Sequence, residues 1–307
     1  MNYITNNKGS VTILIILIAG VIMTVGLGFN WLVREHIKAS MGLKNKAEAI
    51  LKARSAYDTL IYLMLNGQLA ENEMIFSGVQ DLTKLTSIPL NGKEVSLADD
   101  LYVKVQDSNG LLSLTNINSQ AIERLIKNVA QVENPSIPVN SLLDWIDSSA
   151  FTRINGAGKS YYREQQLPYQ TRNYALQYKE EITFVRGVGR DIYTKIEPYL
   201  TMLPSSGFNP NTADDEVLKA YLNIETESLN ALKDYMSKTP LTSSAALFLL
   251  TGRQLTSTLE VANFSPSRFM EITVRAGSPR SLYTIKAGLH FISDSNTPYS
   301  VLYWREE

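Results

Sequence analysis

Two acidic residues, Asp144 and Asp147, form the most suggestive pair of reactive groups in this sequence. They stand three residues apart in a predicted helix, a spacing that places both carboxylates on one helix face. Such a pair suits general acid–base chemistry, and so do the adjacent hydroxyls of Tyr161 and Tyr162. Neither pair is accompanied by a nucleophile or cofactor motif, which favours surface or capping roles. We therefore expect that the protein is not an enzyme.

The composition of the chain argues against most other kinds of catalytic or metal site. The 307-residue chain has no cysteine and two histidines, His36 and His290. The absence of cysteine excludes disulfides, thiolate zinc sites and thiol nucleophiles. A histidine metal centre or a Ser-His-Asp triad is disfavoured, because the two histidines stand far apart in the sequence. The net charge of −1 gives no reason to expect nucleic acid as a partner.

The N-terminal region reads as a membrane anchor. Residues 11–33 contain no charged residue, and a helix of this length spans about 34 Å, enough to cross a bilayer core of about 30 Å. The apolar region of a cleaved secretory signal is usually shorter, about 7 to 15 residues. We therefore expect a retained transmembrane helix.

The same helix is expected to continue beyond the membrane. Apolar residues recur on one helical face: Ile50, Ala53, Tyr57, Leu60 and Met64. Asn66-Gly67 is a plausible stop. One long helix over residues 11–65 follows, lipid-embedded at one end and half-buried on a protein domain at the other.

Strand patterns lie on both sides of a helical region, which predicts an α+β protein. Residues 100–105 and 111–114 flank a turn signal at 107–110, the pattern of a hairpin. Three strands of a C-terminal antiparallel meander are predicted at residues 268–274, 282–291 and 300–304. The expected arrangement is an N-terminal helix packed on a small antiparallel sheet, with a large all-α domain inserted. The predicted ranges are the helix 10–66, the first part of the sheet domain 67–115, the insert 116–262 and the last strands 263–307.

Two motifs stand out within the insert. Gly187-Val188-Gly189 joins two predicted helices in a helix-hairpin-helix pattern, where glycine permits positive φ and close backbone approach. Asn209-Pro-Asn211-Thr212-Ala213 precedes Asp214, and this stretch is expected to cap a further helix.

The first nine residues resemble the leader of type IV prepilins. They are short and polar and end in Lys8-Gly9, directly before the apolar run. The resemblance implies that a prepilin peptidase cuts between Gly9 and Ser10, so that residues 1–9 are the leader. Most pilins carry a glutamate at the fifth mature position, where this chain has Leu14.

Motifs along most of the chain resemble the K-type minor pseudopilin of type II secretion, in that family's order. They are residues 105–110, 142–147, Gly156-Ala157, Tyr162, 169–173, 181–187, 198–200 and 209–213. This family also characteristically lacks the glutamate at the fifth mature position. The resemblance implies a pilin fold interrupted by a helix-hairpin-helix (SAM-like) α domain.

The same resemblance implies a cellular role. The protein would assemble with the I and J minor pseudopilins at the tip of a pseudopilus, initiate it and support protein export. The major pseudopilin and the inner-membrane secretion platform would be further partners. The chain would cross the bacterial inner membrane once, with its C-terminal domain in the periplasm.

Calcium is the one ion that the resemblance implies, and no cofactor is required. In the family, acidic loops after the Asp-Trp-x-Asp run can bind calcium, and hard cations take several oxygen ligands. Asp144, Asp147 and Asn155 are the candidate ligands here. Ser148 and Ser149 stand where relatives commonly have acids, and Gly158 where a glutamate commonly follows Gly-Ala.

DNA binding is the main alternative function. A membrane anchor followed by helix-hairpin-helix and Asn-x-Asn-Thr-Ala motifs also resembles the competence DNA receptor ComEA. Residues 209–240, however, contain six acids and three lysines, a local net charge of −3. That charge is unfavourable for binding phosphate backbones, so we expect no nucleic-acid partner.

Overall fold

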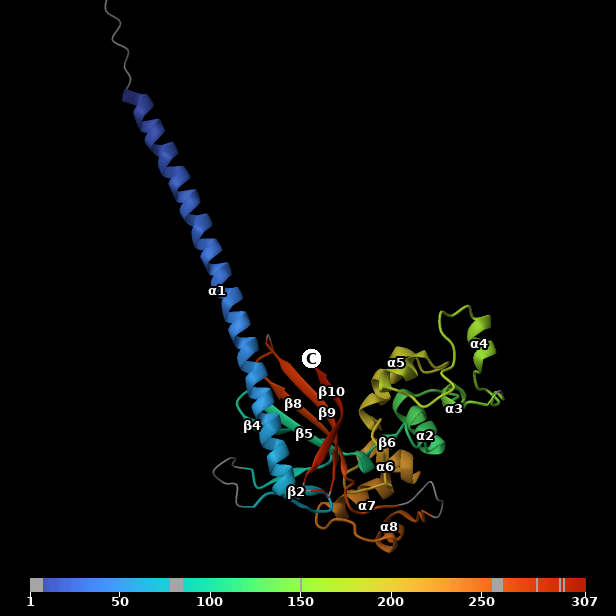
Figure 1. Cartoon of the computed structure of the whole chain (residues 1–307). Coiled ribbons are helices and arrows are strands. Elements are labelled where there is room, and N and C mark those ends of the chain that lie inside the picture. Colours follow the sequence, from blue (N-terminus) through green and yellow to red (C-terminus); the bar gives the residue numbers. More distant parts are fainter. Residues whose placement is uncertain are drawn as a thin grey trace, which may run out of the picture.

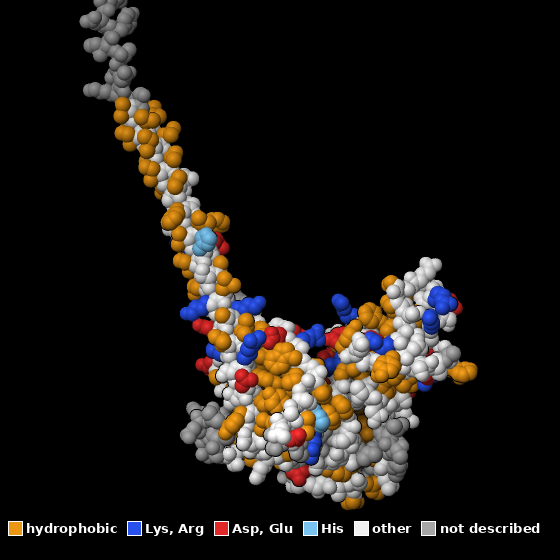
Figure 2. Space-filling view, in the orientation of Figure 1, with side chains coloured by type: hydrophobic (Ala, Val, Ile, Leu, Met, Phe, Trp, Pro, Cys, Tyr) orange, Lys and Arg blue, Asp and Glu red, His pale blue; other side chains and the backbone are white. Residues whose placement is uncertain are grey.

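A single long helix, α1 (Lys8–Asn66), extends far out of an otherwise compact head (Figure 1). The computed structural model describes residues 8–77, 85–149, 151–255, 262–279, 281–292, 294 and 296–307. Every side chain of α1 from Val11 to Glu48 is exposed, and apolar side chains cover the outer part of the helix (Figure 2). Among the described residues, this is the one helix long and apolar enough to cross a membrane.

The inner part of α1 packs on the sheet, as its apolar stripe predicted. Ala53, Leu60 and Met64 are almost fully buried, and the helix lies against β8 (Phe269–Ala276) and β9 (Tyr283–Phe291). The Tyr57 ring meets the ring of Trp304 edge-on, with centroids 4.8 Å apart. One helix therefore has an apolar surface on all sides at one end and an apolar stripe at the other.

The main sheet has five antiparallel strands in the order β10-β9-β8-β5-β4. Besides β8 and β9 it contains β4 (Val95–Ala98), β5 (Leu101–Asp107) and β10 (Tyr299–Glu306). Residues of β8 alternate strictly between buried and half-buried, which fits one face packed on α1. The predicted C-terminal meander is confirmed. A smaller sheet contains β1 (Gln68–Leu69), β2 (Glu73–Ile75) and β3 (Ser87–Pro89).

The predicted hairpin after β5 is wrong. Residues 108–110 form a short 3₁₀ helix, η1 (Ser108–Gly110), and β6 (Leu112–Ser113) does not return along β5. It pairs instead in parallel with β7 (Leu200–Thr201). The physical reason is that both edges of β5 are already taken, by β4 and by β8.

The insert lies between β5 and β8 and is built almost entirely of short helices. These are α2 (Ser119–Ala130), α3 (Ser136–Ile146), α4 (Lys159–Glu164), η2 (Lys179–Phe184), α5 (Gly189–Ile196), η3 (Glu197–Tyr199), α6 (Asp215–Leu222), α7 (Thr226–Met236) and α8 (Ser244–Thr251). Side-chain caps at Asn118, Asp214 and Ser243 fix the N-termini of α2, α6 and α8. Figure 1 places these helices on the side of the sheet away from α1.

Each part of the head has its own hydrophobic core. Leu125, Ile182 and Leu218 belong to the core of the insert, and Val103 and Ile285 belong to the core between the sheet and α1. The predicted α+β class, with its long apolar helix, antiparallel sheet and inserted helices, is confirmed. The predicted domain ranges stay predictions; the chain leaves the main sheet after Asp107 and rejoins it at Phe269.

Candidate functional site

A buried carboxylate stands where the insert leaves the sheet. Asp107, at the end of β5, is fully buried and accepts four hydrogen bonds. Its Oδ1 accepts from the backbone N–H groups of Asn109, at 3.1 Å, and Ser267, at 2.8 Å. Its Oδ2 accepts from Thr212 Oγ1 at 2.9 Å and Asn209 Nδ2 at 3.3 Å. We call these five residues the Asp107 joint.

The joint connects three stretches that are far apart in the sequence. The Asn209 N–H donates to the carbonyl oxygen of Asn109 at 2.9 Å, and Gln106 Nε2 donates to that of Thr212 at 3.1 Å. A Cβ on Gly110 would lie 2.3 Å from the Thr212 carbonyl oxygen, so only glycine permits this approach. Burial raises the pKa of Asp107 above its usual value, against hydrogen bonds from Ser267, Asn109 and Thr212 that lower it.

The Asp107 joint brings together two sequence motifs, residues 105–110 and 209–213, whose contact could not be predicted from the sequence. Asn209 and Thr212 were expected to cap a helix, but Asp214 caps α6 by accepting from the Glu216 N–H at 3.0 Å. The Asn209 stretch binds Asp107 instead. A polar residue in a buried position is costly unless its partners are present, and these partners lie about a hundred residues away in the chain.

A second buried carboxylate, Glu181, crosslinks the insert. Its Oε1 accepts from Trp145 Nε1 at 2.9 Å and from Arg172 Nε, and its Oε2 accepts from the Gln177 N–H at 3.1 Å. Burial opposes ionisation, but Arg172, Trp145 and Gln177 together lower the pKa of Glu181 below its ordinary value. The motif residues Trp145 and Glu181 are therefore partners in the core.

The two tyrosines considered for acid–base chemistry have structural roles. Tyr162 is buried against Trp145, with ring centroids 5.3 Å apart, and its hydroxyl accepts from the Arg186 N–H at 3.0 Å. Burial raises the pKa of Tyr162 to about 12. The Arg186 guanidinium lies 4.6 Å from the centre of the Tyr161 ring. The raised pKa of Tyr162 makes its hydroxyl a poor proton donor or acceptor near neutral pH.

Of the three candidate calcium ligands, the structure brings together Asp144 and Asp147. Between their carboxylates lies the guanidinium of Arg153, 2.8 Å from Asp144 Oδ1 and 3.0 Å from Asp147 Oδ2. The Asn155 amide donates to Ser136 Oγ at 3.4 Å instead. The described residues contain no group of three or more histidine, cysteine, aspartate or glutamate side chains arranged to hold a metal. The donor set present here does not fit calcium.

The Gly-x-Gly turn has the predicted positive φ angles, and it packs against α3. Gly187 and Gly189 both have positive φ, +80° and +60°. A Cβ on Gly187 would lie 3.2 Å from Ile137 and Pro138, so the turn packs closely against the start of α3. The helix before it, η2, is a 3₁₀ helix.

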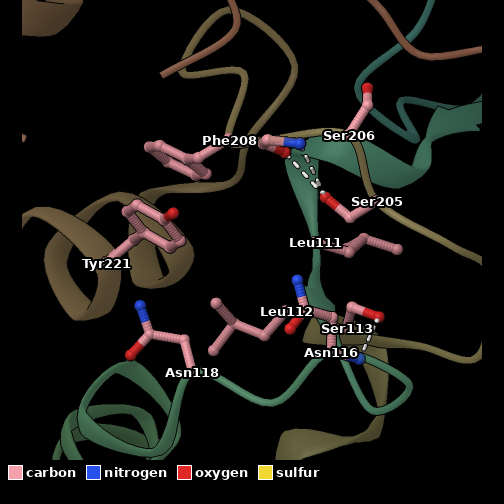
Figure 3. A pocket seen from close by; sticks show the side chains of 10 residues that line it. Leu111, Leu112, Ser113, Asn116, Asn118, Ser205, Ser206, Phe208 and Tyr221 are labelled. Atoms are coloured by element: carbon pink, nitrogen blue, oxygen red, sulfur yellow. Dashed lines mark hydrogen bonds between the residues drawn. The ribbon is translucent and has the colours of Figure 1, made fainter. Parts of the chain in front are cut away.

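A hollow of about 210 Å³ lies beside the joint (Figure 3). The stacked rings of Phe208 and Tyr221, with centroids 3.9 Å apart, line it together with Leu112 and Asn118. Asn118 Oδ1 caps α2 by accepting from the Ala121 N–H at 3.0 Å. No acidic or basic side chain lines the hollow, so it offers no charged group for catalysis.

Taken together, fold and joint define a class: a membrane-anchored, pilin-like protein with a helical insert. Comparison with known families agrees. The family model for type II secretion system protein K matches residues 97–205, which include Asp107 and the Trp145–Glu181 pair. Over this stretch the chain is similar to the K proteins of type II secretion systems.

Curated relatives carry the same family name. A type II secretion system protein K of Pectobacterium carotovorum is 26% identical over 149 residues, 47% of this chain and 45% of that protein. The K protein of Klebsiella pneumoniae is 25% identical over 188 residues, covering 56% of this chain and 55% of the relative. The matched stretches thus span about half the length of these relatives.

A solved structure shares the fold over almost its whole length. It is the GspK-GspI-GspJ complex from enterotoxigenic Escherichia coli, in which one chain is matched over 99% of its residues and 90% of this chain. The TM-score is 0.52 at 18% sequence identity. At that identity the likeness concerns the fold.

Removing the Asp107 carboxylate should destabilise the head. In Asp107→Ala, four buried donors lose their acceptor, and we expect the free energy of unfolding to fall by about 3 kcal/mol. Urea unfolding of the full chain in detergent, followed by circular dichroism, measures this. The exposed Asp99→Ala is the control. Equal stability of the two variants would show that the joint is not a structural tie.

The lowered pKa of Glu181 predicts how the stability of the protein depends on pH. Because its folded-state pKa is lowered below the ordinary 4.5, the stabilisation is complete above that pH and is lost as pH falls through the folded-state pKa. Glu181→Gln should therefore lower the melting temperature at pH 7, and the difference from wild type should shrink below about pH 4.5. The exposed Glu164→Gln serves as control. A difference that stays constant down to pH 3 would contradict this assignment.

Proposed function

We propose that this protein is a tip subunit of a type II secretion pseudopilus, which assembles with I and J minor pseudopilins, initiates the filament and supports protein export. The observation that carries the proposal is the structural likeness to GspK in a complex with GspI and GspJ, which covers nearly all of that chain. The family match over residues 97–205 supports it independently.

The two halves of α1 fit a single-pass membrane protein. Residues 11–33 are uncharged and exposed. Such an apolar surface is unfavourable in water and favourable in the core of a bilayer. The following turns carry Arg34, Lys38, Lys44 and Lys46, which suit the membrane–water boundary. In the proposed topology the head lies in the periplasm.

A groove along α1 offers a surface for the I or J partner. It encloses about 790 Å³ between one side of α1 and β4, lined by Ser55, Leu63, Leu97 and others. Leu51, at its rim, is 69% exposed. Exposed apolar side chains beside an apolar groove are typical of a protein interface. The insert lies on the opposite side of the sheet (Figure 1).

Leu14 supports a position at the filament end. After cleavage at Gly9 it would be the fifth residue of the mature helix. A glutamate there would need a positive partner in lipid, as a buried carboxylate is costly alone. Leu14 needs none, so the subunit does not require an earlier subunit above it.

Partner binding is tested by co-purification. We expect the tagged full chain, co-expressed with the I and J proteins of its own system, to retain both after detergent extraction. Leu51→Glu should reduce their recovery at least tenfold, because a charge enters the groove beside α1. Leu249→Glu, at an 84% exposed position on α8, should not. Failure of the wild type to retain either partner would refute the proposed assembly; equal recovery with both variants would refute only the groove.

Processing is tested at Gly9. Gly9→Val should leave the nine-residue leader attached, because the leader that these residues resemble is cut directly after its glycine. Mass spectrometry of the membrane-extracted protein reports the N-terminus directly. Gly20→Ala, a substitution with open space around it on the same helix, should be processed normally. A mature N-terminus at Ser10 in Gly9→Val would overturn the leader assignment.

A further inference from the structure

The loop between α3 and α4 is folded around one arginine. Arg153 binds both carboxylates with its guanidinium, at 2.8 Å from Asp144 Oδ1 and 3.0 Å from Asp147 Oδ2. Its backbone N–H also donates to Asp144, 3.2 Å from each carboxylate oxygen. A single residue thus contacts three of the four carboxylate oxygens through its side chain and main chain.

The surrounding backbone closes tightly on Asp144. The Asp144 side chain is only 2% exposed, and a Cβ on Gly156 would lie 2.0 Å from its Oδ2. A calcium ion takes six to eight oxygen ligands at roughly 2.3–2.6 Å. With Gly156 on one side and Arg153 on the other, that shell has no room around Asp144.

Arg153 already neutralises one of the two negative charges without an ion. Without a cation between them, two neighbouring carboxylates would repel each other, and each would make ionisation of the other more costly. A hydrogen bond from the Ser149 backbone and one from the Arg153 side chain lower the pKa of Asp147. Residues 148–158 contain no aspartate or glutamate, so the loop brings no further negative charge for a divalent ion to neutralise.

We propose that Arg153 is the built-in cation of this loop: its guanidinium occupies the place between Asp144 and Asp147 that a divalent ion would take, so that the insert folds without calcium. An arginine suits this role because its planar donors can hold two carboxylates at once. The ordering of the loop becomes part of the folding of the chain, independent of ion concentration.

The loop that Arg153 orders also makes backbone contacts with neighbouring elements. The loop continues from Arg153 to Ile154, whose carbonyl oxygen accepts from Asn140 Nδ2 at 2.9 Å, and to Gly156, whose carbonyl oxygen accepts from Arg186 at 3.0 Å. These bonds join the loop to α3 and to the segment after η2. Loss of Arg153 should therefore loosen the whole connection between α3 and α4.

The test is thermal unfolding of the full chain in detergent, in 1 mM EDTA and in 5 mM calcium chloride. The wild type should melt at the same temperature in both, within about 1 °C. Arg153→Ala in EDTA should melt about 4 °C lower, because Asp144 and Asp147 lose their shared hydrogen-bond donor. The exposed Arg163→Ala, on α4, is the matched control and should melt like the wild type. Arg153→Lys, which keeps the charge with fewer donors, should fall between.

Calcium titration calorimetry of the wild type gives a readout that does not depend on any variant folding. The absence of binding at millimolar calcium supports the proposal. A calcium-dependent rise of several degrees in the wild-type melting temperature, or a binding isotherm that Asp144→Asn abolishes, would overturn it. Equal melting of Arg153→Ala and Arg163→Ala would overturn it as well.

Discussion

A buried carboxylate requires hydrogen-bond donors, and this requirement at Asp107 determines how the two parts of the head meet. The sheet supplies the carboxylate at the end of β5, while the insert and the returning chain supply Asn209, Thr212 and Ser267. An unpaired carboxylate in that position would cost several kcal/mol. The contact therefore specifies one arrangement of the insert against the sheet, where apolar packing alone would tolerate several.

The remaining architecture follows from how each part shields its apolar surface. The inner half of α1 covers one face of the sheet, and the insert closes around its own core, where Glu181 and Trp145 are paired. The outer half of α1 has no protein partner among the described residues and exposes Ile13, Met23 and other large apolar side chains. In the proposed role these side chains face lipid. The outer half of α1 would then lie in the membrane and the inner half in the water-exposed head.

Periodic features were predictable from the sequence, and contacts between distant segments were not. The stripe on α1 and the alternation in β8 follow local rules, and the structure confirms both. The turn signal at residues 107–110 was misinterpreted as a hairpin because local pattern gives no information on which edges of β5 are free. Asp144 and Asp147 were identified as a pair, but Arg153, nine residues after Asp144 in a loop, has no periodic relation to them.

The insert departs from and returns to adjacent, antiparallel strands. Asp107 is the register partner of Met270 across β5 and β8, so the two crossing points lie side by side at the same end of the sheet. A tight turn at that end would close the ladder without any other strand changing its neighbours. A different helical segment could therefore be inserted between β5 and β8 without changing the strand order, provided that it supplies hydrogen-bond donors for Asp107.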